Sequence, residues 1–268
     1  PPFSLSLSLQ EQLRDIARRL ALRLGVVGLL NIQFAIKDQV IYVIEANPRA
    51  SRTVPFVSKS TGVPLAKIAA RIMAGEKLAD LHLPADDRDF DYFCVKEAVM
   101  PFGRFPGSDV VLGPEMKSTG EVMGIAGNFP AAFTKTQLAI DYEPPRGGEV
   151  FISVNDGDKR NITAIARSIA RLGFSLVATT GTARALRASG IECEEVGKIH
   201  AGSHTILDRI ASGEIVLMIN TPFGSSTNTD GYEMRAACVR HGVSYCTTLA
   251  GAQALIAGME AVRETGLD

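Results

Sequence analysis

The stretch that decides the fold runs from Tyr142 to Lys159 and reads YEPPRGGEVFISVNDGDK. Its Pro-Pro and Gly-Gly pairs are typical of a linker, because neither residue type favours a helix or strand interior. A short apolar run from Val150 to Val154 follows and predicts a buried strand. The strand then enters a polar turn around Gly157. The stretch therefore predicts a domain boundary, placed between residues 143 and 144, with a strand and a helix-opening turn directly after it.

Beyond this boundary, short apolar runs alternate with amphipathic segments. Strands are predicted at 150–154, 175–178, 215–219 and 243–246, and helices at 159–172, 182–188, 204–212, 232–241 and 249–259. Short strands that alternate with helices imply a parallel sheet with helices on both faces. Residues 144–268 are therefore predicted to form a parallel α/β domain.

The part before the boundary has a different pattern. It predicts helices at 13–24, 64–73 and 129–140, a hairpin of strands at 28–36 and 40–46, and a strand at 93–100. Residues 102–124 are rich in glycine and proline, so we expect an ordered loop there. A hairpin implies antiparallel pairing. Residues 1–143 are therefore predicted to be an α+β domain with a largely antiparallel sheet.

Composition limits the classes of protein to consider. A chain of 268 residues with 46% hydrophobic residues suits two globular domains. The net charge of −1 gives no electrostatic footprint for nucleic acid, and no apolar run reaches the length of a membrane span. The four cysteines form no C-x-x-C pair. We therefore expect thiols in a reducing, cytoplasmic location.

A polar cluster marks the end of the second hairpin strand. Glu45 and Asn47 lie two residues apart, so their side chains share a face of the strand, and Arg52 follows closely. Gln33 joins that face if the turn at residues 37–39 has three residues, whereas a two-residue turn places it on the other face. Such oxygen ligands suit Mg²⁺ that is also held by phosphates. Alternatively, Glu-x-Asn-Pro merely ends a strand and opens a turn.

A second set of polar residues lies at the predicted carboxyl ends of the parallel strands. Parallel sheets bind ligands there, and the N-termini of the following helices present free N–H groups to anions. Each threonine or asparagine can equally serve as a helix cap. The candidate anion-binding residues are Ser153, Lys159, Thr179, Thr182, Lys198 and Asn220.

Several runs carry a family resemblance. The motif Asn31-x-Gln33-Phe34 and the run from Ile44 to Gly62, IEANPRASRTVPFVSKSTG, resemble the end of an ATP-grasp domain. The longer run is similar to that of the carbamoyl-phosphate synthase large chain. The match extends through Pro64-Leu65-Ala66-Lys67, Val95-Lys96-Glu97 and the run from Leu112 to Gly124, LGPEMKSTGEVMG. It covers nearly the whole chain.

The resemblance implies a ligase that makes carbamoyl phosphate with ATP for arginine and pyrimidine biosynthesis. That family has two ATP-grasp halves, and a regulatory domain follows the second, which phosphorylates carbamate. Gln33, Glu45 and Asn47 would hold the Mg²⁺ or Mn²⁺ that bridges the ATP phosphates. Arg52 would hold the carbamate or the transferring phosphoryl group. The resemblance also implies a glutamine amidotransferase small chain as partner and an oligomeric full enzyme.

The ATP-grasp fold clamps ATP between two lobes, and this sequence matches only the last part of one lobe. We therefore expect a C-terminal fragment of the enzyme that makes no carbamoyl phosphate by itself.

The later residues resemble the methylglyoxal-synthase-like regulatory domain of the same family. The resemblance implies UMP as inhibitor and IMP as activator, bound by the six candidate anion-binding residues named above. Bacterial relatives often carry Asn-Thr-Thr where this chain has Asn220-Thr221-Pro222, so we expect altered UMP sensitivity. Glu97, Tyr245 and Thr247 match an ornithine site, although the family's two other acidic contacts precede Pro1.

Three other readings compete. The first is a nucleotide-binding regulatory module without catalysis. The second is a methylglyoxal synthase, which needs a Gly-Gly-Asp carboxylate where this chain reads Ala201-Gly202-Ser203-His204. The third is another ATP-grasp ligase, such as a biotin carboxylase relative. The appended α/β domain and the run from Val54 to Val57 argue against it.

Overall fold

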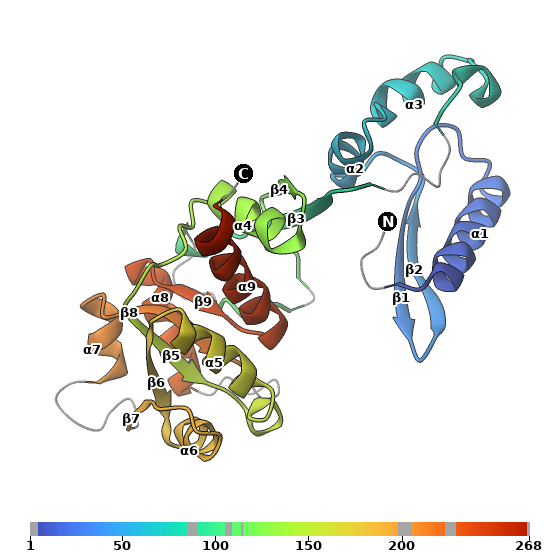
Figure 1. The fold of residues 1–268 in the computed structure, drawn as a ribbon. Coiled ribbons are helices and arrows are strands. Elements are labelled where there is room, and N and C mark those ends of the chain that lie inside the picture. The colour runs from blue at the N-terminus through green and yellow to red at the C-terminus, as the bar shows by residue number, and fades with distance from the viewer. Residues whose placement is uncertain are drawn as a thin grey trace. The chain divides into compact units, whose positions relative to one another are not determined.

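The computed structural model describes residues 5–84, 90–104, 109–113, 115–197, 205–222 and 229–266. It divides into two compact units, Pro1–Asp91 and Tyr92–Asp268 (Figure 1). The described residues between 92 and 143 thus belong to the same compact unit as the later α/β segment. The domain boundary that the sequence places between residues 143 and 144 stays a prediction.

The first unit contains three α-helices and a hairpin among its described residues. Helix α1 (Leu7–Arg23) is capped by the Ser6 side chain, which accepts from Leu9 N, and it ends before Gly25, whose φ is 61°. Strands β1 (Asn31–Lys37) and β2 (Val40–Asn47) form the predicted hairpin. Helices α2 (Thr53–Thr61) and α3 (Leu65–Met73) and a 3₁₀ turn (Leu78–Leu81) follow.

The hairpin has the shorter of the two turns that the sequence left open. Lys37 pairs with Val40, so Asp38 and Gln39 form a two-residue turn, with φ angles of 50° and 64°. The register then shifts, because Phe34 pairs with Val43 whereas Gln33 pairs with Glu45. One extra residue on β2 therefore forms a bulge, and the bulge returns Gln33 to the face of Glu45.

The second unit begins with an antiparallel pair covered by a helix. Strands β3 (Phe93–Val99) and β4 (Gly120–Ala126) pair along their full lengths, and a 3₁₀ turn (Phe102–Arg104) follows β3. Helix α4 (Phe129–Ala139) starts at the side-chain cap of Asn128 and packs against both strands. The expectation of loop throughout 102–124 was wrong, because it missed the start of β4.

The parallel sheet has the strand order β7-β6-β5-β8-β9. Its elements are β5 (Glu149–Ser153), a 3₁₀ turn (Asp156–Asp158), α5 (Ile162–Arg171), β6 (Ser175–Thr179), α6 (Thr180–Ala188), β7 (Glu194–Val196), α7 (Ile206–Ala211), β8 (Ile215–Asn220), α8 (Thr229–His241), β9 (Ser244–Cys246) and α9 (Leu249–Thr265). The predicted α/β alternation is confirmed, with β7 as an addition.

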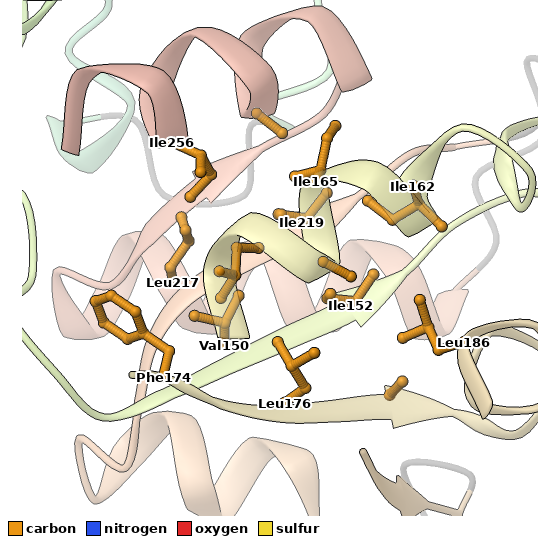
Figure 2. Packing of buried hydrophobic residues seen from close by; sticks show 14 of the residues in the cluster. Val150, Ile152, Ile162, Ile165, Phe174, Leu176, Leu186, Leu217, Ile219 and Ile256 are labelled. Carbon is orange, nitrogen blue, oxygen red and sulfur yellow. The ribbon is translucent and has the colours of Figure 1, made fainter. Parts of the chain in front are cut away.

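Two hydrophobic clusters lie on opposite faces of this sheet. Along β5, Val150 and Ile152 face helices α5, α6 and α9, whereas Phe151 faces α7 and α8. Figure 2 shows the first cluster, with Leu217 and Ile219 of β8 beside them. All five side chains are fully buried. Burial on both faces explains why the three central strands, β5, β6 and β8, contain continuous apolar runs.

The direction of the strands fixes the place of a ligand site. Strand β6 lies on one side of β5 and β8 lies on the other. The chain therefore reverses its winding direction between β5 and β8, which makes their carboxyl ends a topological switch point. Open α/β sheets bind ligands at such points.

Candidate functional site

The first candidate site is the polar corner at the end of the hairpin. Gln33 and Glu45 lie directly opposite each other, and Asn47 lies two residues further along the same face. Asn47 Nδ2 donates to Glu45 Oε1 at 2.8 Å. Gln33 and Glu45 are exposed and Asn47 is half-buried. The bulged register thus brings the three sequence-predicted ligands together.

Their chemistry fits a hard cation whose remaining ligands come from phosphate. One carboxylate and two amide oxygens are the donors that Mg²⁺ accepts while it keeps open positions. In the described parts of the chain, no group of three or more His, Cys, Asp and Glu residues could hold a metal. Arg52 lies at the N-cap of α2 with its side chain exposed. These residues could therefore hold phosphate oxygens through a cation and a guanidinium group.

The second candidate site is a cavity of about 280 Å³ at the switch point, which we call the switch-point cavity. Ser153 and Thr179 line it at the ends of β5 and β6, and Thr179 Oγ1 lies 3.3 Å from Ser153 Oγ. Asn220 lines it at the end of β8. Gly181 lines it at the start of α6, a nine-residue helix. Hydroxyl groups and a helix N-terminus therefore converge on one space, as anion binding requires.

Lys159 reaches the edge of the switch-point cavity. A Cβ atom added at Gly181 would lie 2.9 Å from Lys159 Nζ, so the glycine leaves room for the ammonium group. Lys159 also pairs with Asp156, and this hydrogen bond lowers the pKa of the Asp156 carboxyl group. Lys159 follows a 3₁₀ turn, whereas the sequence predicted that it begins the helix.

Thr182 is held inside the protein. It is 1% exposed, and its hydroxyl accepts from Val154 N at 3.2 Å and from Thr179 Oγ1 at 3.3 Å. It thus fixes the two strand ends relative to each other. Lys198, the remaining candidate, lies outside the described residues.

A buried arginine contacts Asn220, one of the residues that line the switch-point cavity. Arg235 of α8 is 4% exposed, and its Nη1 donates to Asn220 Oδ1 at 2.8 Å. Its Nε and Nη2 donate to the two carboxylate oxygens of Asp109 at 2.8 Å and 2.6 Å. Sequence reasoning missed both residues, because they are 126 positions apart and neither belongs to a local motif.

A third candidate site is a larger cavity of about 660 Å³ within the second unit, which we call the second cavity. Glu97, Tyr245 and Thr247 all line it. Glu97 Oε2 accepts from Thr136 Oγ1 at 2.6 Å and from Gln137 Nε2. Burial raises the pKa of Tyr245 to about 12, so its phenol is a neutral hydrogen-bond donor at physiological pH. The structure therefore brings the three residues together around one space.

Comparison with protein families matches both parts of the chain. Residues 1–81 match the family described as "Carbamoyl-phosphate synthase L chain, ATP binding domain", and residues 161–247 match the family "MGS-like domain". The chain thus combines part of an ATP-binding domain with an MGS-like domain. In the described residues, no helix is long and apolar enough to cross a membrane.

Curated relatives identify the family. The chain is 49% identical to the carbamoyl phosphate synthase large chain of Myxococcus xanthus over 268 residues, which is 100% of this chain and 25% of that protein. It is 51% identical to that of Methanothermobacter thermautotrophicus over 266 residues, again 25% of that protein. The chain belongs to the carbamoyl phosphate synthase large chain family, and it spans about a quarter of the length of these relatives.

One solved structure aligns with part of the chain. The crystal structure of methylglyoxal synthase from Elizabethkingia anophelis aligns with 42% of this chain and 78% of its own length, with a TM-score of 0.34 and 19% sequence identity.

Proposed function

We propose that this chain takes part in the ATP-dependent phosphorylation of carbamate to carbamoyl phosphate. In this proposal the first unit supplies one wall of the ATP site and the second unit binds regulatory ligands. The observation that carries it is the bulged hairpin register, which puts Gln33 opposite Glu45 and on the face of Asn47. The family match over residues 1–81 supports the same assignment.

In this site, Gln33, Glu45 and Asn47 would hold Mg²⁺ or Mn²⁺ together with ATP phosphates. The metal would neutralise phosphate charge that develops during transfer. Arg52 would hold the carbamate or the transferring phosphoryl group, because its planar guanidinium can bind two oxygens at once. Positioning and charge neutralisation account for most of the catalysis in phosphoryl transfer. We therefore expect these four residues to act by orienting the ATP phosphates and the carbamate and by neutralising charge.

The second unit is proposed to bind UMP and IMP through the switch-point cavity. The hydroxyl groups of Ser153 and Thr179, the N-terminus of α6 and the ammonium of Lys159 supply the phosphate contacts; Thr182, Lys198 and Asn220 complete the proposed set. Glu97, Tyr245 and Thr247 are proposed to hold ornithine, with the carboxylate on its ammonium and the two hydroxyls on its α-carboxylate. A glutamine amidotransferase small chain, an oligomeric full enzyme and a cytoplasmic location belong to the same proposal.

A regulatory module without catalysis is the second candidate function. The described residues that line the switch-point cavity all belong to the second unit. This lining supports a proposal in which the second unit binds the nucleotide by itself. The two candidates share the nucleotide site and differ in whether the hairpin corner takes part in chemistry.

A thermal-shift titration of the chain with UMP, IMP and ornithine tests the regulatory part. A ligand at 100 times its dissociation constant stabilises the folded state by about 2.7 kcal/mol. For a unit of this size, that corresponds to a rise in melting temperature of roughly 5–10 °C. Lys159→Gln should reduce the nucleotide-induced shift, whereas Arg160→Gln, which removes the neighbouring exposed cation, should not. No shift with any of the three ligands contradicts regulatory binding.

Activity assays separate the two candidates. We expect the chain by itself to make no carbamoyl phosphate from ATP, ammonia and bicarbonate. In a full-length large chain with the same residues, Glu45→Gln should lower carbamoyl phosphate synthesis at least tenfold if it holds the metal, because a neutral amide attracts a divalent cation less. Unchanged activity of that variant would contradict a catalytic role for the polar corner of the hairpin. It would not affect the proposal that the second unit binds nucleotides.

A further inference from the structure

Arg235 is a buried cation whose partners lie on two different segments. Its guanidinium makes three hydrogen bonds, two to Asp109 and one to Asn220. A buried guanidinium needs such partners, since an unpaired buried charge is strongly destabilising. Gly231, one turn earlier in α8, makes the approach possible, because a Cβ there would lie 2.9 Å from Arg235 Nη1. The Arg235 guanidinium therefore lies close to where a side chain at position 231 would begin.

The contact with Arg235 fixes the orientation of Asn220. A guanidinium has hydrogen-bond donors only, so the oxygen of the Asn220 amide must face it. The amide nitrogen then points the other way and donates to the Ser153 carbonyl oxygen at 3.1 Å. Asn220 is 6% exposed and lines the switch-point cavity. Arg235 is thus a positioning residue for an amide at the cavity wall.

The hydrogen bonds of Arg235 connect Asn220 to the loop of residues 109–113. Asp109 Oδ1 also accepts from Val111 N at 3.2 Å, and Lys117 Nζ donates to the Asp109 carbonyl oxygen at 3.3 Å. Val110 is 4% exposed and lines the second cavity. Cys238 of α8, one turn after Arg235, lines that cavity too. The Arg235–Asp109 pair therefore holds a wall of the second cavity against the same helix that orients Asn220.

We propose that Arg235 couples the two cavities, so that occupation of the switch-point cavity restrains residues 109–113. The proposal rests on nucleotide binding at the switch-point cavity. A ligand that fixes Asn220 also fixes its partner Arg235, and through Arg235 the Asp109 side chain. Coupling of this kind is reciprocal, so a ligand in the second cavity alters nucleotide affinity by the same factor.

Hydrogen exchange of the 268-residue chain with UMP as probe tests the coupling. In the wild-type chain, saturating UMP should slow amide exchange in residues 109–113 by roughly fivefold or more, the range typical of coupled sites. Asp109→Asn should reduce this slowing below about twofold while it changes the UMP dissociation constant by less than about threefold, because the direct contacts of Asn220 remain. Arg235→Lys should weaken UMP binding roughly tenfold and also abolish the slowing, since it loses the planar fork. Arg240→Lys, on the exposed face of α8, is the matched control and should behave like wild type.

The possible outcomes distinguish the coupling from the nucleotide site on which it depends. If UMP binds and slows exchange in residues 109–113 equally in Asp109→Asn and wild type, the coupling is wrong while the nucleotide site stands. If UMP does not bind the wild-type chain, both the nucleotide site and the coupling are wrong. Should Arg235→Lys fail to fold, as judged by circular dichroism, Asp109→Asn alone decides, because Arg235 keeps its bond to Asn220 in that variant.

Discussion

Ser153 and Asn220 are the last residues of two adjacent parallel strands, and they pair in register with each other. Asn220 Nδ2 donates to the Ser153 carbonyl oxygen at 3.1 Å. This bond joins the strand ends at the point where the sheet reverses its winding direction. The two side chains therefore line the same cavity from opposite sides of the switch point.

Asn220→Asp tests whether that cavity receives an anion. The substitution keeps the shape of the side chain, and the new carboxylate can still accept from Arg235. It adds negative charge at the cavity wall and removes the donor to Ser153. We expect UMP affinity to fall roughly tenfold or more, because two like unit charges about 4 Å apart near a protein surface repel each other by roughly 1–4 kcal/mol, and about 1.4 kcal/mol corresponds to a tenfold change. Isothermal titration calorimetry measures this. Affinity equal to wild type contradicts an anion site beside Asn220.

Gly124→Ala tests the close packing of β4 against α4. An added Cβ would lie 2.0 Å from the Ala132 carbonyl oxygen and 2.9 Å from Lys135 Cβ, so backbone has to move. Overpacking of this kind typically costs about 1–3 kcal/mol in the free energy of unfolding. Gly127→Ala is the matched control, since no heavy atom lies within 4 Å of its added Cβ. Urea denaturation of both variants provides the comparison, and equal stabilities contradict the packing argument.

The hairpin shows how much of the site the sequence could reveal. The residue types of Gln33, Glu45 and Asn47 predicted their chemistry, and the alternation of a strand predicted that Glu45 and Asn47 share a face. The position of Gln33 depended on the turn length, and the expectation that a two-residue turn places it on the other face was wrong, because a bulge supplies one extra residue. Asp38-Gln39 is not a typical two-residue turn sequence, since such turns usually contain glycine. The bulge has no local sequence signal of its own.

Two other elements show why local propensity was insufficient. Helix α2 was missed because its sequence, TVPFVSKST, contains a proline and β-branched residues that disfavour helices. The proline lies in the first turn, where its missing N–H costs nothing. Strand β4 was missed because glycines disfavour strands. Gly124 is nevertheless required, because the backbone of α4 lies against it.

Arg209→Met tests a buried charge at the other end of the parallel sheet. The Arg209 side chain is 7% exposed and pairs with Glu149 at 2.6 Å, Glu194 at 2.7 Å and Glu214 at 3.4 Å. Removal of the cation leaves three carboxylates close together. We expect a loss of about 2–4 kcal/mol in stability, below the full cost of a broken buried pair because two of the carboxylates are well exposed.

The double variant Arg209→Met with Glu149→Gln checks the cause of that loss. Glu149 is the most buried of the three partners, with 25% of its side chain exposed. If unpaired negative charge causes the destabilisation, the second substitution should restore part of the stability, as measured by thermal denaturation. A double variant less stable than the single one would mean that lost packing, and not charge, is responsible.

Asp109→Asn should also change how stability depends on pH. Burial raises the pKa of the Asp109 carboxyl group, but the hydrogen bonds from Arg235 and from the backbone of Val111 and Val110, together with the positive charge of Arg235, outweigh burial, so the pKa lies below its usual value. A carboxyl group whose pKa is lowered by folding stabilises the folded state above its unfolded pKa of about 3.9, and that contribution is lost as the pH falls through the folded pKa. Wild type should therefore exceed Asp109→Asn in stability by roughly 1–3 kcal/mol at pH 7, and the difference should shrink below about pH 4.

Urea denaturation followed by circular dichroism between pH 7 and pH 3 measures this difference directly. The control is Glu264→Gln, which removes a carboxylate from the exposed end of α9 and should show a difference near zero at every pH. A constant stability difference between wild type and Asp109→Asn over this range would mean that the ionised carboxylate does not hold Arg235. The bond from Arg235 to Asn220 would then have to satisfy the buried guanidinium almost alone, and the connection from Asn220 to residues 109–113 would lose its physical basis.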